Sequence, residues 1–273
     1  MHHPPYLTIE KSVGETPLVA LERLRSVHHI PSTVPLAYAG RLDPMASGKL
    51  LVLVGDECKK QEQYHAFDKE YQFEILLGIK SDTGDVLGIL SAATKAPTYA
   101  EQTLIDTIKT FCGNISLPYP HFSSRTVKGK PLHTWTLEGR LDEIKIPVQH
   151  SLVHKLALTG IRRVPAQALY TYATEKIETI PQVTDERKAL GADFRRTDVR
   201  ASWQAWYKTH ENETYQIASC TCIASSGTYM RSLAEAIGSK LDTPALAFSI
   251  HRTKIGKYLP IIPHHVGIWT KSF

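Results

Sequence analysis

The residue of this chain best suited to do chemistry is an aspartate in a glycine-rich segment. Residues 37–50 read AYAGRLDPMASGKL, with Asp43 between Gly40 and Gly48. A carboxylate can form a covalent intermediate with a substrate without a metal or a redox cofactor. The glycines let the backbone pass close to a ligand, and Pro44 fixes the chain after the carboxylate. An Asp-Pro pair taken alone predicts only a turn.

Three further segments carry polar and aromatic side chains. Residues 68–71 read DKEY, residues 225–233 read SSGTYMRSL, and residues 250–256 read IHRTKIG. Each side chain also has an ordinary structural interpretation. Tyr71 could be a half-buried strand tyrosine, and Arg231 could be a surface arginine on a helix. The turn-like segment SDTGD at residues 81–85 is interpreted as structural.

In this order the segments resemble the motifs of TruB-type pseudouridine synthases. The catalytic motif of that family, GHxGxLDPxAxGxL, is matched in register by Gly40, Leu42, Asp43, Pro44, Ala46, Gly48 and Leu50. The resemblance extends from about residue 11 to residue 256. It implies an α+β pseudouridine synthase fold, with a mixed, mostly antiparallel central sheet and flanking helices. It also implies an isomerase that acts on a flipped-out uridine, at position 55 in the T loop of tRNA.

The resemblance assigns a role to each site residue. Asp43 is expected to be the nucleophile, and Arg231 to pair with it in two-point geometry and keep it ionised. Tyr71 is expected to lie against the flipped base and is a candidate for the proton removed from C5. The expected substrate-binding residues are Tyr38, Lys69, Tyr229 and Ile250. The candidate contacts to the RNA backbone are Lys128, Lys130, Arg162, Arg163, Arg195, Arg196 and Arg252.

The catalytic segment departs from the family pattern at two positions. Tyr38 stands where the family has a histidine, and its aromatic ring could occupy the same slot by stacking. Arg41 replaces a small residue, and the Arg-Leu-Asp sequence is similar to that of RluA-type synthases. Two alternatives therefore stay open: an RluA-like enzyme acting on ribosomal RNA, and a non-catalytic RNA-binding or RNA-folding protein on the same scaffold.

We expect a catalytic domain over residues 1–258 that contains an extended helical insertion at 166–208. Residues 259–273 are expected to form a short C-terminal tail without an accessory RNA-binding domain. Trp203 and Trp206 lie in the basic part of the insertion. They predict either contacts that replace lost RNA contacts or packing of the helix on the core.

Bulk composition agrees with a globular protein that acts on an anion. Net charge is +5 over 273 residues, which permits a nucleic-acid partner without identifying one. None of the four cysteines forms a Cys-x-x-Cys pair, and the sequence suggests no metal site and no cofactor. No run approaches the length of a membrane span. The cysteine usage predicts a reducing cytoplasm as the compartment and the hydropathy predicts no membrane association. The resemblance implies a monomer that binds the T arm of tRNA without an obligatory protein partner.

The spacing of apolar residues and the positions of glycine and proline predict the elements that position these residues. Ser226 is expected to be the N-cap of the helix at 228–241. Pro244 is expected to open a final short helix. The remaining predicted helices are 17–26, 100–111, 167–180 and 185–208, the predicted strands are 50–54, 71–77, 145–158 and 214–224, and 118–130 is predicted as a loop.

Overall fold

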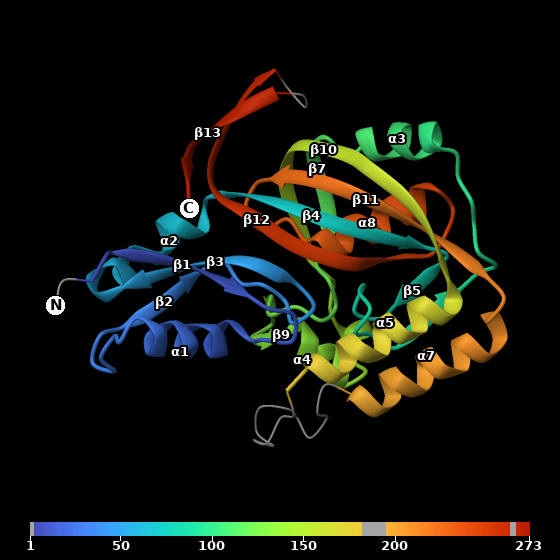
Figure 1. Cartoon of the computed structure of the whole chain (residues 1–273), viewed down its shortest axis with the longest axis horizontal. Coiled ribbons are helices and arrows are strands. Elements are labelled where there is room, and N and C mark those ends of the chain that lie inside the picture. Colours follow the sequence, from blue (N-terminus) through green and yellow to red (C-terminus); the bar gives the residue numbers. More distant parts are fainter. Residues whose placement is uncertain (1–2, 182–194, 263–265) are drawn as a thin grey trace.

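A twisted sheet runs through the molecule. The computed structural model describes residues 3–181, 195–262 and 266–273. The strand order is β1-β3-β12-β4-β11-β10-β7, with β2 paired with β3 and β13 with β12 (Figure 1). The β3–β12 pair is parallel and the other pairs are antiparallel, so the predicted mixed sheet is confirmed. The strands are β1 (Tyr6–Lys11), β2 (Leu36–Ala39), β3 (Ser47–Val54), β4 (Asp68–Leu77), β7 (Gly113–Pro118), β10 (Val148–Pro165), β11 (Thr214–Ala224), β12 (Ala245–Ile262) and β13 (Val266–Ser272).

Helices flank this sheet, which confirms the α+β class. α8 contacts β12, β4 and β7, and α3 contacts both α8 and β10. α5 and α7 lie side by side and form a separate layer (Figure 1). Within the described residues, no helix has the length and apolarity to cross a membrane. The helices are α1 (Pro17–Val27), α2 (Gln61–His65), α3 (Glu101–Lys109), α4 (Leu132–Leu137), α5 (Ala166–Thr179), α7 (Arg196–His210) and α8 (Met230–Lys240), with two 3₁₀ turns at η1 (Gly55–Lys60) and η2 (Leu141–Glu143).

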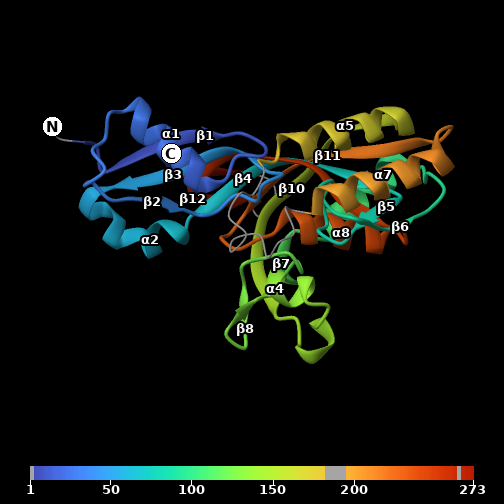
Figure 2. The same ribbon diagram turned by 90° about the horizontal axis from the view of Figure 1, so that it is seen from below.

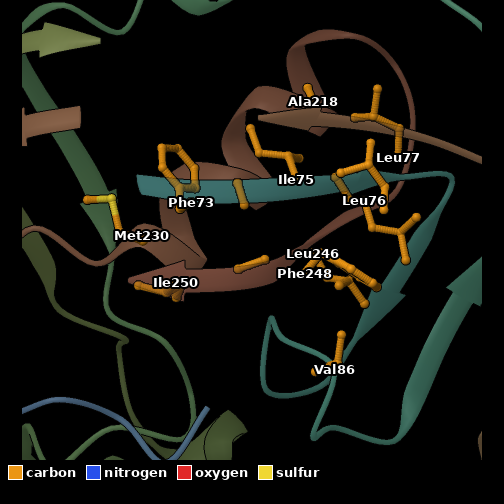
Figure 3. Packing of buried hydrophobic residues seen from close by; sticks show 14 of the residues in the cluster. Phe73, Ile75, Leu76, Leu77, Val86, Ala218, Met230, Leu246, Phe248 and Ile250 are labelled. Carbon is orange, nitrogen blue, oxygen red and sulfur yellow. The ribbon is translucent and has the colours of Figure 1, made fainter. Parts of the chain in front are cut away.

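The main hydrophobic core lies along the central strands. Figure 3 shows buried side chains on the adjacent strands β4 and β12, where Phe73 and Ile250 are cross-strand partners. Leu76, Leu77 and Leu246 have no exposed surface. Residues 75–77 of β4 and 245–248 of β12 are buried on both faces of the sheet. This part of the sheet is rigid, because moving either strand would open cavities in a close-packed interior. The residues that follow these strands, or lie on them, are therefore held in place.

Two sequence predictions near the C-terminal half are wrong. Pro244 opens the long strand β12 and not a helix, because residues from 245 onward pair with β4 along most of its length. A proline at the first position suits either element, and here pairing with an existing strand decides the outcome. Ser226 is not the N-cap of α8. That helix begins at Met230 after Tyr229, without a side-chain cap.

The insertion packs its tryptophans into the core. α5 and α7 contact each other, and α7 also contacts β6 (Leu90–Ala93), which pairs with β5 (Ile79–Ser81). Trp203 is fully buried and donates its indole N–H to the carbonyl of Val86 at 3.1 Å, and Trp206 is 5% exposed. The core-packing interpretation of these tryptophans is therefore confirmed. The predicted helix at 185–208 is described only from residue 195 onward, and its first residues lie outside the described part of the chain.

A small lobe at residues 119–147 projects from the sheet (Figure 2). It contains α4, η2 and the short strands β8 (Thr126–Val127) and β9 (Lys130–Pro131), which pair with each other. Leu132, Trp135 and Ile144 form its own hydrophobic cluster. The segment predicted as a loop at 118–130 is thus mostly irregular, with β8 and β9 as short exceptions. We call this unit the 119–147 lobe.

Residues 259–262 and 266–272 continue the sheet. β12 extends to Ile262, and β13 returns beside it, so the expected domain boundary at 258 falls inside a strand. Phe273 packs against Tyr6, Tyr64 and Phe67. The end of β12 and the whole of β13 are therefore part of the central sheet and do not form a separate tail.

Removing the Trp203 indole should destabilise the protein. We expect Trp203→Ala to lower the free energy of unfolding by about 3–5 kcal/mol, because a large side chain is lost from a close-packed site. Gln204→Ala, exposed on the same helix, should change it by less than about 0.5 kcal/mol. Urea denaturation of both variants, followed by far-UV circular dichroism, measures the two free energies of unfolding. Equal effects of the two variants would contradict the packing role.

Candidate active site

Asp43 lies in the connection between β2 and β3. This segment leaves the sheet after Ala39 and returns at Ser47, and it exposes the Asp43 carboxylate while Leu42 and Met45 are buried. Gly48 has a φ of +109°, and a Cβ there would lie 2.3 Å from the carbonyl oxygen of Arg252. Glycine is required at this position because β3 and β12 approach so closely. The sequence prediction of close backbone approach is thus explained by a neighbouring strand and not by a ligand.

Two buried cations hold the Asp43 segment by its main-chain carbonyls. Arg252 donates from Nε to Lys49 O at 2.8 Å, and its terminal nitrogens donate to Arg41 O at 3.2 Å and Gly40 O at 3.1 Å. Lys11 donates to Ala46 O at 2.7 Å. Both side chains are almost completely buried. Because donors bind both ends of the segment, the Asp43 carboxylate is held in a fixed place on the rigid sheet.

The expected contact between Asp43 and Arg231 is present. Nε and Nη2 of Arg231 both approach Oδ2 of Asp43, at 2.9 and 2.7 Å. The predicted geometry differs in one respect, since both nitrogens converge on one carboxylate oxygen. Nη1 and Nη2 also donate to the carbonyls of Thr83 and Phe122, which fixes the plane of the guanidinium. Within the described residues, Oδ1 of Asp43 has no protein donor, so it is available to a substrate.

Burial makes the two partners of this pair unequal. The Arg231 side chain is 4% exposed and the Asp43 side chain is 36% exposed. Burial alone would lower the pKa of Arg231, but the charges of Asp43 and Asp85 raise it above its ordinary value. The guanidinium therefore stays charged, because carboxylates compensate the cost of its burial.

Asp85 is a site residue that the sequence reasoning missed. It comes from the SDTGD turn, is buried, and lies 3.7 Å from Nε of Arg231. Thr83 Oγ1 and the N–H of Leu87 donate to its Oδ1. Burial raises the pKa of the Asp85 carboxyl, and Arg231 opposes that rise. The SDTGD motif contained the signal that could have identified Asp85. A turn accounts for its glycine, but a turn does not require a second aspartate.

A cavity of about 850 Å³ opens beside this ion pair. Tyr38 of β2, Tyr71 of β4, Ile250 of β12 and Tyr229, just before α8, all line it. Asp43 and Arg231 lie in the same wall. The structure therefore brings together, around one cavity, residues that the sequence separates by more than 200 positions.

Tyr71 has a hydroxyl that stays protonated well above neutral pH. Its burial raises the pKa of the phenol, and the charge of Arg252 acts in the opposite direction. Arg252 is its cross-strand neighbour on β12. A neutral phenol can donate and accept hydrogen bonds, and it has no charge that must be desolvated.

The ring of Tyr229 packs against the ring of Tyr119. Their rings lie 5.5 Å apart in an edge-to-face arrangement. The Tyr119 hydroxyl donates to Gln149 Oε1, and the guanidinium of Arg125 lies 5.1 Å from the centre of the Tyr119 ring. Tyr119 belongs to the 119–147 lobe, so this contact joins the lobe to the wall of the cavity.

Lys69 and Arg252 do not fit the roles predicted for them. Lys69 was expected to bind substrate, but its ammonium donates to the carbonyls of His65 and Phe67 and to Ser226 Oγ. Arg252 was expected to contact the RNA backbone, but it is 1% exposed and its donors bind carbonyls of the Asp43 segment. Both residues line the cavity while their polar groups are used to fix its walls.

The other predicted backbone contacts lie in three places. Lys128 and Lys130 are in the 119–147 lobe, where Lys130 pairs with Glu138. Arg162 and Arg163 are exposed on β10, outside the cavity lining, and Arg162 pairs with Glu74. Arg195 and Arg196 begin α7 and line the cavity. Arg195 pairs with Asp82 and lies over the ring of Phe122, and Arg196 donates to Ile180 O.

Comparison of the sequence with family models gives one family. Residues 29–179, more than half of the chain, match the model described as "TruB family pseudouridylate synthase (N terminal domain)". The matched span contains Asp43, Tyr71 and Asp85. No group of three metal-binding side chains occurs among residues 3–181, 195–262 and 266–273.

Curated relatives are similar over most of this chain. Proteins named tRNA pseudouridine synthase B are 27% identical over 92% of it in Caldicellulosiruptor saccharolyticus and 24% identical over 93% of it in Deinococcus deserti. The alignments cover 67% and 74% of those two proteins. A relative from Caldanaerobacter subterraneus subsp. tengcongensis is 30% identical over 56% of this chain and 52% of its own length. The chain thus spans about half to three quarters of the length of these relatives.

Among solved structures, a chain from the crystal structure of a Cbf5-Nop10-Gar1 complex has a similar fold. The TM-score is 0.54 at 16% identity, covering 92% of this chain and 48% of that one. A likeness at this identity supports the fold. It agrees with the pseudouridine synthase architecture expected from the sequence.

The buried ammonium of Lys69 should make the free energy of unfolding depend on pH. Burial, with a smaller contribution from Arg252, lowers its pKa to about 8. Between this value and the ordinary value of 10.5, the unfolded chain holds the proton and the folded chain does not, so unfolding becomes harder as pH rises. Relative to Lys69→Met, the natural protein should gain roughly 1–2 kcal/mol of stability from pH 7 to pH 9.5.

Urea denaturation of both proteins at the two pH values measures this gain. Lys257→Met, which removes an exposed lysine from the same sheet, reports the general effect of losing one lysine. A stability difference between natural protein and Lys69→Met that is the same at pH 7 and pH 9.5 would show that Lys69 is not desolvated.

Proposed function

This chain belongs to the TruB family of pseudouridylate synthases, and we propose from that premise that it isomerises uridine to pseudouridine in tRNA. The observation that carries the proposal is the Asp43–Arg231 ion pair at the wall of a cavity of about 850 Å³. A carboxylate with one oxygen held and the other accessible is suited to attack a carbon atom. The names of the relatives support tRNA as the RNA. The target we propose is uridine-55 in the T loop.

The reaction needs a nucleotide that has left its base stack. Extrusion costs about a few kcal/mol, which contacts with the flipped base and the backbone must supply. Tyr71, Tyr229 and Ile250 provide aromatic and aliphatic walls on which a pyrimidine can stack. The net charge of +5 favours approach of an RNA stem-loop, which is recognised largely by shape and backbone.

Asp43 is the nucleophile in the proposed reaction. It bonds to the target nucleotide as the bond between C1′ of the ribose and N1 of uracil breaks, and the uracil turns within the cavity. C5 then bonds to C1′, Asp43 leaves, C5 loses its proton and N1 gains one. The reaction is an isomerisation, so its atoms and electrons balance without a co-reactant. Arg231 donates to Oδ2 of Asp43 and so orients the carboxylate for its attack.

Tyr71 can serve the proton transfer only as a relay. Its raised pKa keeps the phenol protonated at neutral pH, so it must release its own proton to accept the one from C5. The Asp43 carboxylate, once released, is a second candidate base in the wall of the cavity. Tyr71 also forms the surface against which the uracil turns.

Conversion of a defined RNA by the purified chain tests the activity. A tRNA T-arm hairpin is incubated with the protein alone, and its nucleosides are analysed by mass spectrometry for pseudouridine. Formation at position 55 without added proteins supports both the target and independence from a protein partner. Conversion of ribosomal RNA fragments but not of the T arm would favour the RluA-like alternative. RNA binding without any conversion would favour a non-catalytic RNA-binding protein.

Removing the charge of Asp43 should separate turnover from binding. We expect Asp43→Asn to lower turnover at least about 10³-fold, since an amide cannot replace the nucleophile. The dissociation constant for the T-arm RNA should change little, because most of the affinity comes from the backbone. Asp106→Asn, which removes an exposed carboxylate on α3, is the matched control and should turn over normally. Turnover of Asp43→Asn near that of the natural protein would exclude Asp43 as the nucleophile.

A further inference from the structure

The cationic side chains around the cavity differ in their ion-pair and hydrogen-bond partners. Arg231 pairs with Asp43 and Asp85, and Arg195 pairs with Asp82. The nitrogens of Lys69 and Arg252 donate to main-chain carbonyls. Arg196 donates to Ile180 O. All five have protein partners before any substrate binds.

Arg41 is the exception among the cavity-lining cations that the structure describes. Its side chain is exposed. Within residues 3–181, 195–262 and 266–273, no carboxylate or carbonyl accepts a hydrogen bond from its guanidinium and no aromatic ring lies beneath it. Its main chain, in contrast, is fixed, because Arg41 O accepts a hydrogen bond from Arg252 at 3.2 Å. An exposed guanidinium on a fixed backbone keeps its binding capacity for a partner outside the protein.

Arg41 lies close to Asp43 in the chain. The two residues are separated by one residue, so their Cα atoms are at most about 7 Å apart. Burial raises the pKa of the Tyr229 hydroxyl most strongly, followed by the charge of Asp43, and Arg41 is among the cations that oppose this rise. The guanidinium of Arg41 therefore acts at the same part of the cavity as Asp43 and Tyr229.

From this arrangement we propose that Arg41 binds a phosphate next to the flipped nucleotide, and so helps to hold that nucleotide out of its stack. The inference rests on the proposed function and adds to it one residue of substrate binding. With the base inside the cavity and C1′ at Asp43, the phosphates attached to the same ribose must lie at the opening. A guanidinium there can form two parallel hydrogen bonds to phosphate oxygens.

A phosphate explains the site better than a base does. The buried cations Lys69, Arg252 and Lys11 have no salt bridge to a carboxylate among the described residues, so they leave a positive potential behind the opening. That potential favours an anion at the position of Arg41. The cavity already has aromatic surfaces for a base in Tyr71 and Tyr229.

Neutralising single phosphates tests the proposal by a double-mutant cycle. Binding is measured in the Asp43→Asn background, so that no RNA is converted, over a range of KCl concentrations. The RNAs are a T-arm hairpin, the same hairpin with a methylphosphonate linkage on the 5′ or 3′ side of the target uridine, and one with a methylphosphonate in the distant stem. The added protein changes are Arg41→Ala, Arg41→Lys and, as the matched control, Arg23→Ala. Arg23 is an exposed arginine on α1, outside the cavity lining.

We expect Arg41→Ala to weaken binding to the natural hairpin about tenfold and to reduce the salt slope by about one. One of the two flanking methylphosphonates should weaken binding to the parent protein but not weaken binding to Arg41→Ala any further. The stem methylphosphonate and Arg23→Ala should show no such coupling. Arg41→Lys should retain most of the salt slope, because the charge remains.

Two results would overturn the proposal. Arg41→Ala could leave affinity and salt slope unchanged, or it could weaken every RNA equally, including both flanking methylphosphonates. The second pattern would indicate a contact to a base or a folding defect. Because binding is read separately from turnover, failure of the parent enzyme to form pseudouridine would refute the proposed function and leave the phosphate contact measurable.

Discussion

The ion pair between Asp43 and Arg231 is the interaction on which the arrangement of the site depends. A guanidinium that is nearly inaccessible to water must have its charge compensated and its donors satisfied, or it would destabilise the fold. Asp43, Asp85 and the carbonyls of Thr83 and Phe122 do this together. These partners come from the β2–β3 connection, the 81–85 turn and the 119–147 lobe. One buried cation therefore fixes three segments relative to α8 and makes a site from parts distant in sequence.

The Asp43 segment is held by positive side chains that act on the backbone. Lys11 and Arg252 donate to carbonyls at Gly40, Arg41, Ala46 and Lys49, and Lys69 fixes the neighbouring turn at 65–67. This use of charge leaves the carboxylate of Asp43 accessible on a rigid connection. It also concentrates positive potential behind the cavity, which suits a polyanionic substrate. Preorganisation of this kind lowers the cost of orienting a nucleophile during the reaction.

The elements around the site are of two kinds: some extend the core and the sheet, and one reaches the cavity. α5 and α7 extend the core through Trp203 and Trp206, and the hairpin of β12 and β13 extends the sheet. The 119–147 lobe has a hydrophobic cluster of its own and reaches the site through Tyr119 and Phe122. It is the unit that both projects from the sheet in Figure 2 and contacts residues of the site. An RNA that enters the cavity must therefore pass close to it.

The sequence by itself determined the local features of this protein. Alternating apolar residues predicted β4 and β11, and the motifs predicted that Asp43, Tyr71, Tyr229 and Arg231 belong to one site. Only the tertiary structure decided what residues 245–262 become, because a proline followed by an apolar run can open a helix or a strand until β4 pairs with it. The same holds for Arg252, Lys69 and Asp85. A charged residue in a sequence looks solvent-exposed, and whether it faces a phosphate or a buried carbonyl depends on which distant strand lies over it. The type and spacing of residues encode chemical capacity, whereas burial and partners arise from long-range packing.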